Sequence, residues 1–565
     1  MIINDKIKLH IFLLSNHMVN SMLIRFFSNL NFWKISSFFI IFLLLLPIVA
    51  IIIMSYQDNF GIWKHLVNTK LFLYLLNTSL LMLGVAFFTL IIGVSCAWII
   101  SRYDFFLSNI IEWALLLPAA IPAYIVAYCY TDFLEYGGLV QSLIRESFNL
   151  QSSKDYYFPE IRSMPGAIFM MSFVLYPYVY FITKVAFNST PSNLLEFAKI
   201  HGKSEFFYVA FPLARPAIIA GLSLVLMETI SDFGTVEYLA IETLTLGIFN
   251  LWLGMNSLSA ASQLSLVAFT FIVVLLGLEL SARKRQKFND TKIQHFGKKL
   301  KKVNLKKNIL YFSICMLPIL IGFILPVFIL IFLSFDNFDV SSFFQVLEIS
   351  INSLSISLIG ALLIILISFL IAVSVRYHAS KKLTYFSIAA GSGYAFPGVI
   401  LALGTTVVLS MFQEVLNSLF FTLTLDWNIA LIGSYSALLF AYVCRFNAIG
   451  FGSINSGILR MPPNLLEASR MQGASFKKGL LLIVSPLIRP SILTGLLLVF
   501  VDIFKELPMT LLLRPFNFET LATYVYQYAK EEMLEQCALG ALFIVLIGII
   551  PIIVLNKAIN LSHKR

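Results

Sequence analysis

The sequence predicts an all-α polytopic membrane protein with about 12 transmembrane helices in two parallel six-helix repeats. Three observations carry this prediction. The chain is 59% hydrophobic and only 12% charged, with a mean hydropathy of +0.88. Apolar runs of about 20 residues, the length that crosses a bilayer, recur along it. Polar sequence patterns in the first half return in the second half, roughly 270 to 275 positions later.

The apolar runs are continuous and do not alternate with polar residues, so they favour helices over a closed barrel. We expect no soluble catalytic domain between them. The five cysteines lie in or beside apolar runs without a Cys-x-x-Cys spacing, which favours packing roles. The predicted spans are 35–55, 74–100, 110–130, 166–187, 215–238, 261–281, 309–333, 352–375, 385–410, 428–448, 489–512 and 536–556.

The charged segments predict the orientation of the chain. Between Arg283 and Lys307 there are eleven Lys and Arg residues and one acid, Asp290. Because cytoplasmic loops carry an excess of Lys and Arg, this segment and the basic tail should face the cytoplasm, whereas the more acidic loop 131–165 should face outward. The predicted organisation is a cytoplasmic segment 1–34, a first repeat 35–281, a basic linker 282–308, a second repeat 309–556 and a basic tail 557–565.

The duplication runs through both halves. Asn77-Thr78-Ser79-Leu80 corresponds to Asn352-Ser353-Leu354, and Ala120-Ile121-Pro122 corresponds to Ala395-Phe396-Pro397. Six spans per repeat is an even number, so both repeats have the same orientation and are related by an axis along the membrane normal. A pathway for substrate between the two halves is the natural expectation.

The clearest duplicated pattern is a polar cytoplasmic loop. Its first copy contains Glu196, Ala198, Gly202 and Pro212, and its second copy contains Glu467, Ala468, Gly473 and Pro486. Each Glu is expected to begin a short helix, and each Gly to end it in a left-handed turn. Ten positions separate Gly from Pro in the first copy and thirteen in the second. An ordinary pair of interfacial helices explains one such loop, whereas two copies at one face suggest paired docking sites for a soluble partner.

These loops resemble the Glu-Ala-Ala…Gly coupling loop of ABC importer permeases, although neither copy keeps the full Glu-Ala-Ala and the first is three residues short. Longer strings resemble the iron(III) importer permeases. They are Tyr157-Phe158-Pro159-Glu160-Ile161-Arg162-Ser163, Leu175-Tyr176-Pro177-Tyr178-Val179-Tyr180, Met227-Glu228-Thr229-Ile230-Ser231-Asp232-Phe233-Gly234-Thr235-Val236, Lys505-Glu506-Leu507-Pro508 and Arg514-Pro515-Phe516-Asn517-Phe518.

The resemblance implies a type I importer permease with two fused halves in the bacterial inner membrane. It implies two copies of an ABC ATPase subunit, which would bind the coupling loops, and a periplasmic ferric-binding protein that delivers iron(III). ATP hydrolysis would take place on the separate ATPase. No cofactor, bound metal, catalytic residue or nucleic-acid partner is expected for the chain itself, and the only other partner is membrane lipid.

Acids inside the predicted spans mark a candidate translocation pathway, namely Glu228, Asp232, Asp502 and Glu506, with Lys505 beside them. Glu228 and Asp232 are four apart and share one helix face, and Asp502 and Glu506 repeat them 274 positions later. Asp232 lies sixteen residues beyond Pro216, about 24 Å along a helix.

Two interpretations of these acids stay open. In the first, they form an acidic funnel for a hard cation. In the second, they have a structural role in packing, and Lys505 or Arg445 neutralises an acid across the repeat interface. By ideal spacing, Lys505 is not expected to lie one helical turn from either acid, although it is adjacent to Glu506 in sequence.

Two functional alternatives to iron import also remain. The cargo of the permease could be thiamine, sulfate, molybdate or a phosphonate. The intramembrane acids could instead serve as relays in an ion-coupled secondary transporter, which would need no ATPase. Gly202-Lys203-Ser204 imitates the end of a phosphate-binding loop, but position 197 is Phe197 where that motif needs Gly, so ATP binding by this chain is rejected.

Overall fold

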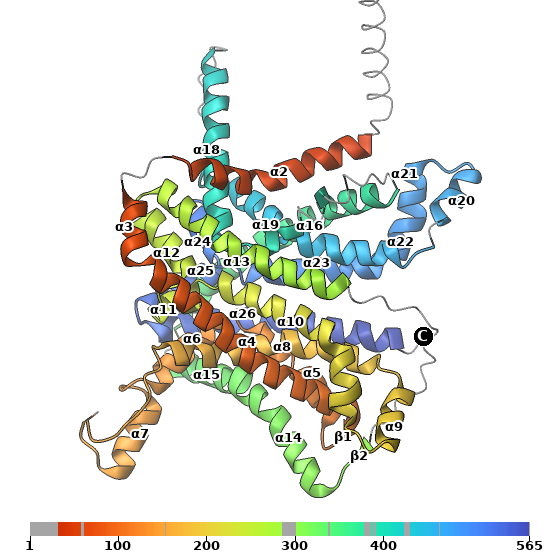
Figure 1. The fold of residues 1–565 in the computed structure, drawn as a ribbon. Coiled ribbons are helices and arrows are strands. Elements are labelled where there is room, and N and C mark those ends of the chain that lie inside the picture. Colours follow the sequence, from red (N-terminus) through yellow and green to blue (C-terminus); the bar gives the residue numbers. More distant parts are fainter. Residues whose placement is uncertain are drawn as a thin grey trace, which may run out of the picture. The chain divides into compact units, whose positions relative to one another are not determined.

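The computed structural model describes residues 32–57, 61–152, 154–284, 301–336, 339–377, 383, 386–387, 391–422, 430–462 and 464–563. Within these ranges ten helices are long and apolar enough to span a membrane, and two bent helix pairs raise the number to as many as twelve. The predicted all-α membrane fold is therefore confirmed (Figure 1). Residues 1–31, 285–300 and 564–565, which belong to the predicted N-terminal segment, linker and tail, lie outside the described residues.

In the first half, three short 3₁₀ or π-helical segments lie between α-helices. The 3₁₀ turn is η1 (Leu117–Ala120), and the π turns are η2 (Phe206–Ala210) and η3 (Asn250–Gly254). The α-helices are α2 (Phe32–Met54), α3 (Ile62–Thr69), α4 (Leu71–Arg102), α5 (Ser108–Ala114), α6 (Ala123–Leu134), α7 (Leu139–Phe148), α8 (Met164–Asn188), α9 (Ser192–Ile200), α10 (Phe211–Ser231), α11 (Gly234–Tyr238), α12 (Leu244–Phe249) and α13 (Leu258–Lys284).

The second half has a similar order of elements. Its turns are η4 (Leu320–Ile324), η5 (Gly391–Ala395) and η6 (Leu480–Val484). Its α-helices are α14 (Leu305–Ile319), α15 (Leu325–Asp336), α16 (Val340–Tyr377), α18 (Gly398–Thr422), α19 (Tyr435–Leu459), α20 (Leu465–Met471), α21 (Phe476–Gly479), α22 (Ser485–Leu487), α23 (Arg489–Phe504), α24 (Pro508–Leu513), α25 (Leu521–Lys530) and α26 (Leu534–His563). Two short strands, β1 (Tyr103–Asp104) and β2 (Lys301–Lys302), pair in parallel.

The chain divides into two compact units that do not coincide with the sequence repeats. The first unit contains residues 1–45, 363–393 and 447–496, and the second contains 46–362, 394–446 and 497–565. In the first unit, helix α20, which belongs to the second candidate coupling loop, packs through Leu466 against a core from α16, α19 and η6. The buried members of that core are Ile365, Ala372, Val373, Ile454, Ile458, Leu466, Leu480, Val484 and Ile488.

Several predicted spans are broken or displaced in the structure. The predicted span 110–130 bends by 89° between η1 and α6, where Pro118 and Pro122 interrupt the backbone hydrogen bonds. The predicted span 215–238 ends at Ser231, and 489–512 ends at Phe504 before Pro508 opens a new short helix. The predicted 385–410 and 428–448 correspond to α18 and α19, which begin and end further along the chain.

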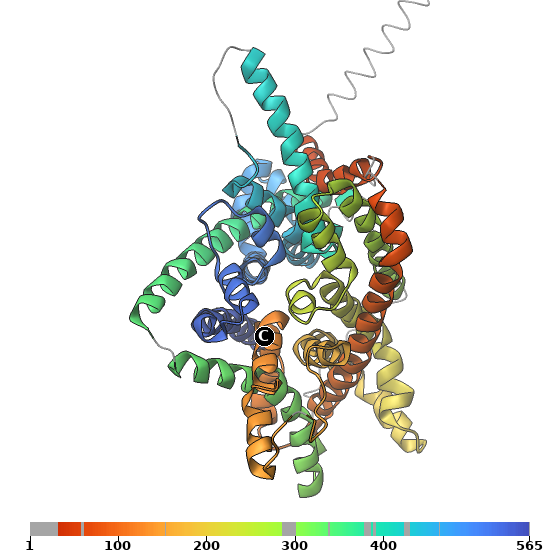
Figure 2. The ribbon, with the colours of Figure 1, turned by 90° about the vertical axis from the view of Figure 1, so that its left-hand side faces the viewer.

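Within the second unit, the first spanning helix of each repeat packs on the other repeat. The Tyr130 hydroxyl on α6 donates to the Ile321 carbonyl of η4 at 2.6 Å. At the matching positions, Gly404 on α18 has no Cβ and leaves room for the Pro47 carbonyl of α2. Figures 1 and 2 show α14 and α15, in green, beside the orange helices α5 and α6. This reciprocal exchange ties the two repeats together.

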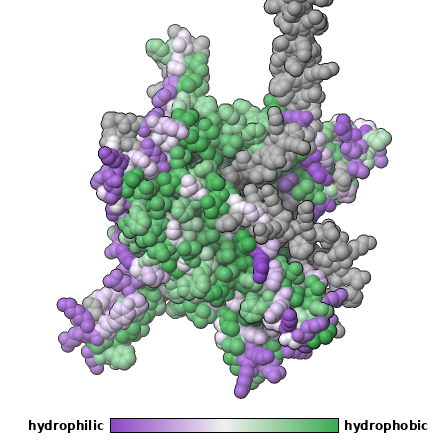
Figure 3. All heavy atoms as spheres, in the orientation of Figure 1, coloured by the Kyte–Doolittle hydropathy of each residue, from purple (hydrophilic) through white to green (hydrophobic). Residues whose placement is uncertain are grey.

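The outer face of α4 is apolar along most of its length, and Figure 3 shows this apolar surface with polar residues gathered toward the helix ends. Its exposed side chains are Phe72, Leu73, Leu76, Leu80, Leu83, Phe87, Phe88 and Ile91. In water such a face would be unfavourable, whereas in a bilayer it contacts lipid acyl chains. The surface therefore agrees with a multi-pass membrane protein.

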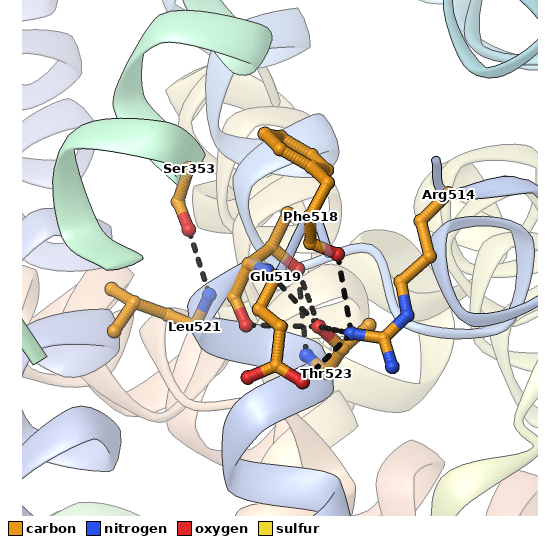
Figure 4. Close-up of polar contacts among 7 residues, drawn as sticks. Ser353, Arg514, Phe518, Glu519, Leu521 and Thr523 are labelled. Carbon is orange, nitrogen blue, oxygen red and sulfur yellow. Dashed lines mark hydrogen bonds and ion pairs between the residues drawn. The ribbon is translucent and has the colours of Figure 1, made fainter. Parts of the chain in front are cut away.

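The duplicated pair Asn77-Thr78 and Asn352-Ser353 has a clear structural role. The Thr78 hydroxyl accepts the backbone N–H of Leu244 at 3.0 Å, and the Ser353 hydroxyl accepts that of Leu521 at 2.7 Å. In both repeats a hydroxyl on a long spanning helix thus satisfies the first N–H of a short helix, α12 or α25, whose end would otherwise be unpaired. Figure 4 shows the second copy, where Arg514 also bonds the Phe518 carbonyl and Glu519.

We predict that Ser353→Ala lowers the apparent melting temperature of the detergent-solubilised protein, because it leaves the buried Leu521 N–H unpaired at a cost of about 1–3 kcal/mol. Ser355→Ala is the matched control, since that exposed hydroxyl bonds only a carbonyl of its own helix. Equal melting temperatures for the two variants would contradict this assignment.

Candidate functional site

The two candidate coupling loops have the same local geometry at the end of their first helix. In the first, Gly202 follows α9 with φ +66°, and Lys203 N–H bonds the Ala198 carbonyl at 2.9 Å. In the second, Gly473 follows α20 with φ +85°, and Ala474 N–H bonds the Ser469 carbonyl at 3.1 Å. The left-handed glycine therefore ends both helices, as glycine does at a helix C-cap.

Exposure also repeats along the two loop helices. Glu196 and Glu467 are both exposed. Glu467 lies in the first turn of α20, but Glu196 lies in the middle of α9, because α9 already begins at Ser192 after Pro191. The expectation that Glu196 begins its helix was wrong.

The apolar positions of these helices repeat as well. Ala198 is buried like Ser469 at the matching position, whereas Ala468 is exposed like Phe197. The next matched pair, Ile200 and Met471, is exposed by 81% and 91%. Each helix thus presents one acid and an apolar side chain to its surroundings.

The three-residue difference between the loops is one additional helical turn. Both copies contain a π turn before the proline, η2 before Pro212 and η6 before Pro486. Only the second has α21 in front of that turn. The second copy also bends by 72° at Ile488, whereas Phe206–Ser231 forms one span with Pro216 inside it. The two loops therefore offer similar helix caps on differently built supports.

An ionic cluster supports the first loop. Glu205, just before η2, accepts hydrogen bonds from Arg102 and Lys301, each at 2.5 Å. Burial raises the pKa of Glu205, but the bonds from Lys301 and Arg102 outweigh it and hold the pKa below the ordinary value of a glutamate. Lys301 also belongs to β2, which pairs with β1 directly after α4. The end of the linker is thereby joined to the first loop.

A charged pocket of about 110 Å³ lies in the second unit. Both repeats contribute to it, through the ends of α10 and α23 and through α6, α8 and α19. All five candidate pathway residues line it. Its polar and charged lining residues are Tyr124, Tyr178, Glu228, Ser231, Asp232, Tyr394, Arg445, Asp502, Lys505 and Glu506.

Asp232 and Glu506 each cap a short helix. Asp232 accepts the N–H groups of Thr235 at 2.9 Å and Val236 at 3.3 Å, at the start of α11. Glu506 accepts those of Met509 at 3.1 Å and Thr510 at 3.0 Å, at the start of α24. A carboxylate satisfies the unpaired N–H groups of a helix N-terminus and is stabilised by them.

The sequence interpretation of these acids needs correction. Asp232 does not share a continuous helix face with Glu228, because α10 ends at Ser231, and Glu506 likewise lies beyond the end of α23. Arg445 does neutralise Glu506, at 3.0 Å, but both residues belong to the second repeat, so this pair does not cross the repeat interface.

Glu228 and Asp502, the other matched acids, have different partners. The Tyr394 hydroxyl of the second repeat donates to Glu228. Asp502 pairs with Lys505 at 3.1 Å. The expectation that Lys505 lies a turn from neither acid was therefore wrong, since residues i and i+3 are neighbours on a helix.

Three polar groups that line the pocket are buried and lack hydrogen-bond partners within the described residues. They are the Tyr124 hydroxyl, the Ser231 hydroxyl and Nε of Arg445. Buried polar groups are rarely left unpaired. These groups are therefore available to water or to a ligand that fills the pocket.

Sequence reasoning missed Tyr124, Tyr178 and Tyr394 as pocket residues. Tyr394 precedes Phe396-Pro397, the second copy of a proline motif that lies inside the predicted span 385–410, and Tyr124 follows Pro122 in the first copy. The duplicated proline motif was the available signal, because a broken helix within the membrane exposes polar backbone that needs partners.

Comparison with known proteins identifies the family to which the chain belongs. The family model described as "Binding-protein-dependent transport system inner membrane component" matches residues 89–282 and 385–565. The chain belongs to this family. It is therefore a multi-pass inner-membrane permease of an ABC importer, built from two copies of the permease domain.

Individual relatives agree with the family but differ in cargo. The Fe(3+)-transport system permease protein FbpB 2 of Haemophilus influenzae is 23% identical over 85% of this chain and 89% of its own length. The molybdenum transport system permease protein ModB of the same organism is 24% identical over 35% of this chain and 87% of its own. The sulfate transport system permease protein CysT of Escherichia coli is 22% identical over 36% and 72%.

We predict that Arg445→Ala reduces the yield of folded permease sharply, because it leaves the Glu506 carboxylate buried without its cation, a change that costs about 3–5 kcal/mol. Adding Glu506→Gln to Arg445→Ala should recover part of the yield. The measurement is the monodisperse fraction after detergent extraction, and a double variant no better than the single would contradict the pairing.

Proposed function

We propose that this permease translocates iron(III) delivered by a periplasmic ferric-binding protein. The observation that carries the proposal is the charge of the pocket. Four carboxylates, Glu228, Asp232, Asp502 and Glu506, face two cationic groups, Lys505 and Arg445, which leaves an excess of two acids. A pocket of that charge attracts a cation and repels an oxyanion.

The charge separates the candidate cargoes. Sulfate, molybdate and phosphonates are anions, and their entry beside Glu228 and Asp232 would place like charges together at low dielectric. Similarity along 85% of the chain to an iron(III) transport permease supports the same cargo, whereas similarity to the molybdenum and sulfate permeases covers little more than a third of it. Thiamine is a cation, so charge alone does not separate it from iron.

The pocket is suited to passage and not to storage. Each of its acids already accepts a hydrogen bond or ion pair from the protein. The negative charge therefore attracts an arriving cation, but few carboxylate oxygens are free to coordinate it. A weakly held ion leaves the pocket readily. The unpaired hydroxyls of Tyr124 and Ser231 add oxygen atoms, which hard cations prefer.

Energy for transport would enter through the coupling loops. Two copies of an ATPase subunit would bind one permease chain, one at α9 and one at α20, through Glu196 or Glu467 and the neighbouring exposed apolar side chains. Hydrolysis would take place on the ATPase, and closure of its dimer would change the conformation of the permease halves. Gly202 and Gly473 matter because their φ angles are strained for any other residue.

We predict that Glu467→Lys with Gly473→Asp abolishes ATP-dependent iron uptake while the protein stays in the membrane, because the docking helix loses its acid and its cap. Glu414→Lys, an exposed acid on α18, makes the same charge change as a control. Glu196→Lys with Gly202→Asp tests the shorter loop and should have the same effect. Normal uptake by either double variant would refute the docking role of that loop.

The cargo is tested in proteoliposomes that contain the permease and its ATPase, with the ferric-binding protein supplied outside. We expect ATP-dependent uptake of radioactive iron and no uptake of sulfate, molybdate, 2-aminoethylphosphonate or thiamine with their own binding proteins. Uptake of any of these in place of iron would overturn the cargo assignment. Uptake without ATP would overturn the importer mechanism in favour of ion-coupled transport.

A further inference from the structure

A seam between the two repeats closes one end of the pocket. Gly234, at the start of α11, lies so close to Leu507 of the second repeat that an added Cβ would meet its side chain at 2.9 Å. The rings of Phe233 and Tyr526 lie 5.9 Å apart across the same seam. Because Phe233, Gly234 and Leu507 also line the pocket, this seam is the wall that cargo must pass on that side.

The seam lies on the side that the charge distribution predicts to face outward. In Figure 1, α11 and α7 lie at one end of α10 and α4, whereas α9 and the β1–β2 pair lie at the other end. The latter end carries the coupling loop and the basic residues Lys301 and Lys302. Basic residues mark the cytoplasmic side, so the end with α11 is the one that a periplasmic delivery protein would meet.

Polar contacts between the repeats cover this seam. Glu237, on α11 of the first repeat, accepts hydrogen bonds from the Tyr526 hydroxyl and from Lys530 Nζ on α25 of the second repeat, both at 2.7 Å. Beside them, Arg162 of the first repeat pairs with Glu532 of the second at 3.0 Å and lies 5.0 Å from the ring of Tyr238.

The two ion pairs differ in how much they stabilise the contact between the repeats. The Glu237 side chain is 16% exposed, whereas Glu532 is 71% exposed. Exposed ion pairs contribute little, and a largely buried acceptor with two donors contributes more. Glu237 is therefore the principal contact. The matching position in the second repeat is Leu511, so only the first repeat has an acid at this position.

We propose that the pair of Glu237 with Lys530 and Tyr526 is a latch that holds the outer end of the translocation pathway closed. For cargo to enter the pocket, the seam at Gly234 and Leu507 must open, and α11 then separates from α25. That separation breaks both hydrogen bonds to Glu237. The latch thus makes the closed state the resting state, and the work of ATP binding includes its release. The proposal is independent of which cargo the permease carries.

Opening is measured with a single cysteine in the pocket, introduced as Ser231→Cys, because Ser231 lines the cavity and the five native cysteines are buried. A membrane-impermeant maleimide is added to the outside of right-side-out vesicles without nucleotide. We expect slow labelling with the latch intact and labelling about tenfold faster in Glu237→Gln. Lys530→Met should show the same increase, and because the Lys530 side chain is 57% exposed, we expect this variant to fold.

The charge exchange Glu237→Lys with Lys530→Glu separates a latch from a merely structural contact. It should return labelling toward the resting rate, because the ion pair is rebuilt in reverse. Glu531→Gln, next to Lys530 in sequence, is the control and should leave the rate unchanged. Resting rates in both Glu237→Gln and Lys530→Met, or no recovery in the exchange, would overturn the proposal.

A second experiment holds the latch shut. Cysteines at positions 237 and 530, introduced as Glu237→Cys and Lys530→Cys, are joined by a short bis-methanethiosulfonate reagent in the complete permease–ATPase complex. We expect ATP-dependent uptake to fall at least tenfold and to recover after reduction, while the ATPase stays bound. Undiminished uptake by the cross-linked protein would show that α11 and α25 need not separate, and would overturn the latch.

Discussion

The structure depends on one constraint: a carboxylate at membrane depth must find donors within the protein. Asp232 and Glu506 meet it in the same way, by accepting the first N–H groups of the short helices α11 and α24. Those N–H groups lack acceptors within a helix because the spanning helices stop at Ser231 and Phe504 and new helices begin after them. Broken helices are tolerated in a bilayer only where their backbone is buried in protein or lines a cavity. The helix break therefore provides the N–H donors for the acid, and the broken backbone lines the pocket.

The same constraint organises the surroundings of the pocket. Gly398 has no side chain where a Cβ would collide with the Arg445–Glu506 pair, so the second repeat has room for a buried cation. Glu228 and Asp502, which cap no helix, are compensated by Tyr394 and Lys505. What remains is an excess of negative charge in a cavity of about 110 Å³ bounded by both repeats, which is the basis of the proposed passage of a cation.

Much of the fold could be predicted from the sequence, because apolar run length and charge bias act locally. The duplication identified Thr78 and Ser353 as matched positions before their hydrogen bonds to Leu244 and Leu521 were known. The left-handed caps at Gly202 and Gly473 were also predictable, since few other residues fit there.

The errors lay where tertiary contacts decide the outcome. Hydropathy treats 215–238 as one span, because nothing in an apolar run reveals that Asp232 will cap the next helix instead of continuing its own. The pairing of Arg445 with Glu506, 61 residues apart, and of Glu237 with Lys530, 293 apart, depends on how helices pack. No local pattern encodes such distances.

The most direct test of the pathway is the number of iron ions imported per ATP hydrolysed by the reconstituted complex, compared between the wild type and Glu228→Gln. Glu228 lies in the pocket near the C-terminal end of α10, sixteen residues beyond Pro212 of the first candidate coupling loop. We expect Glu228→Gln to keep ATP hydrolysis stimulated by the binding protein but to import several-fold fewer ions per ATP. An unchanged ratio would mean that the cargo does not pass this acid, and would contradict the proposed pathway.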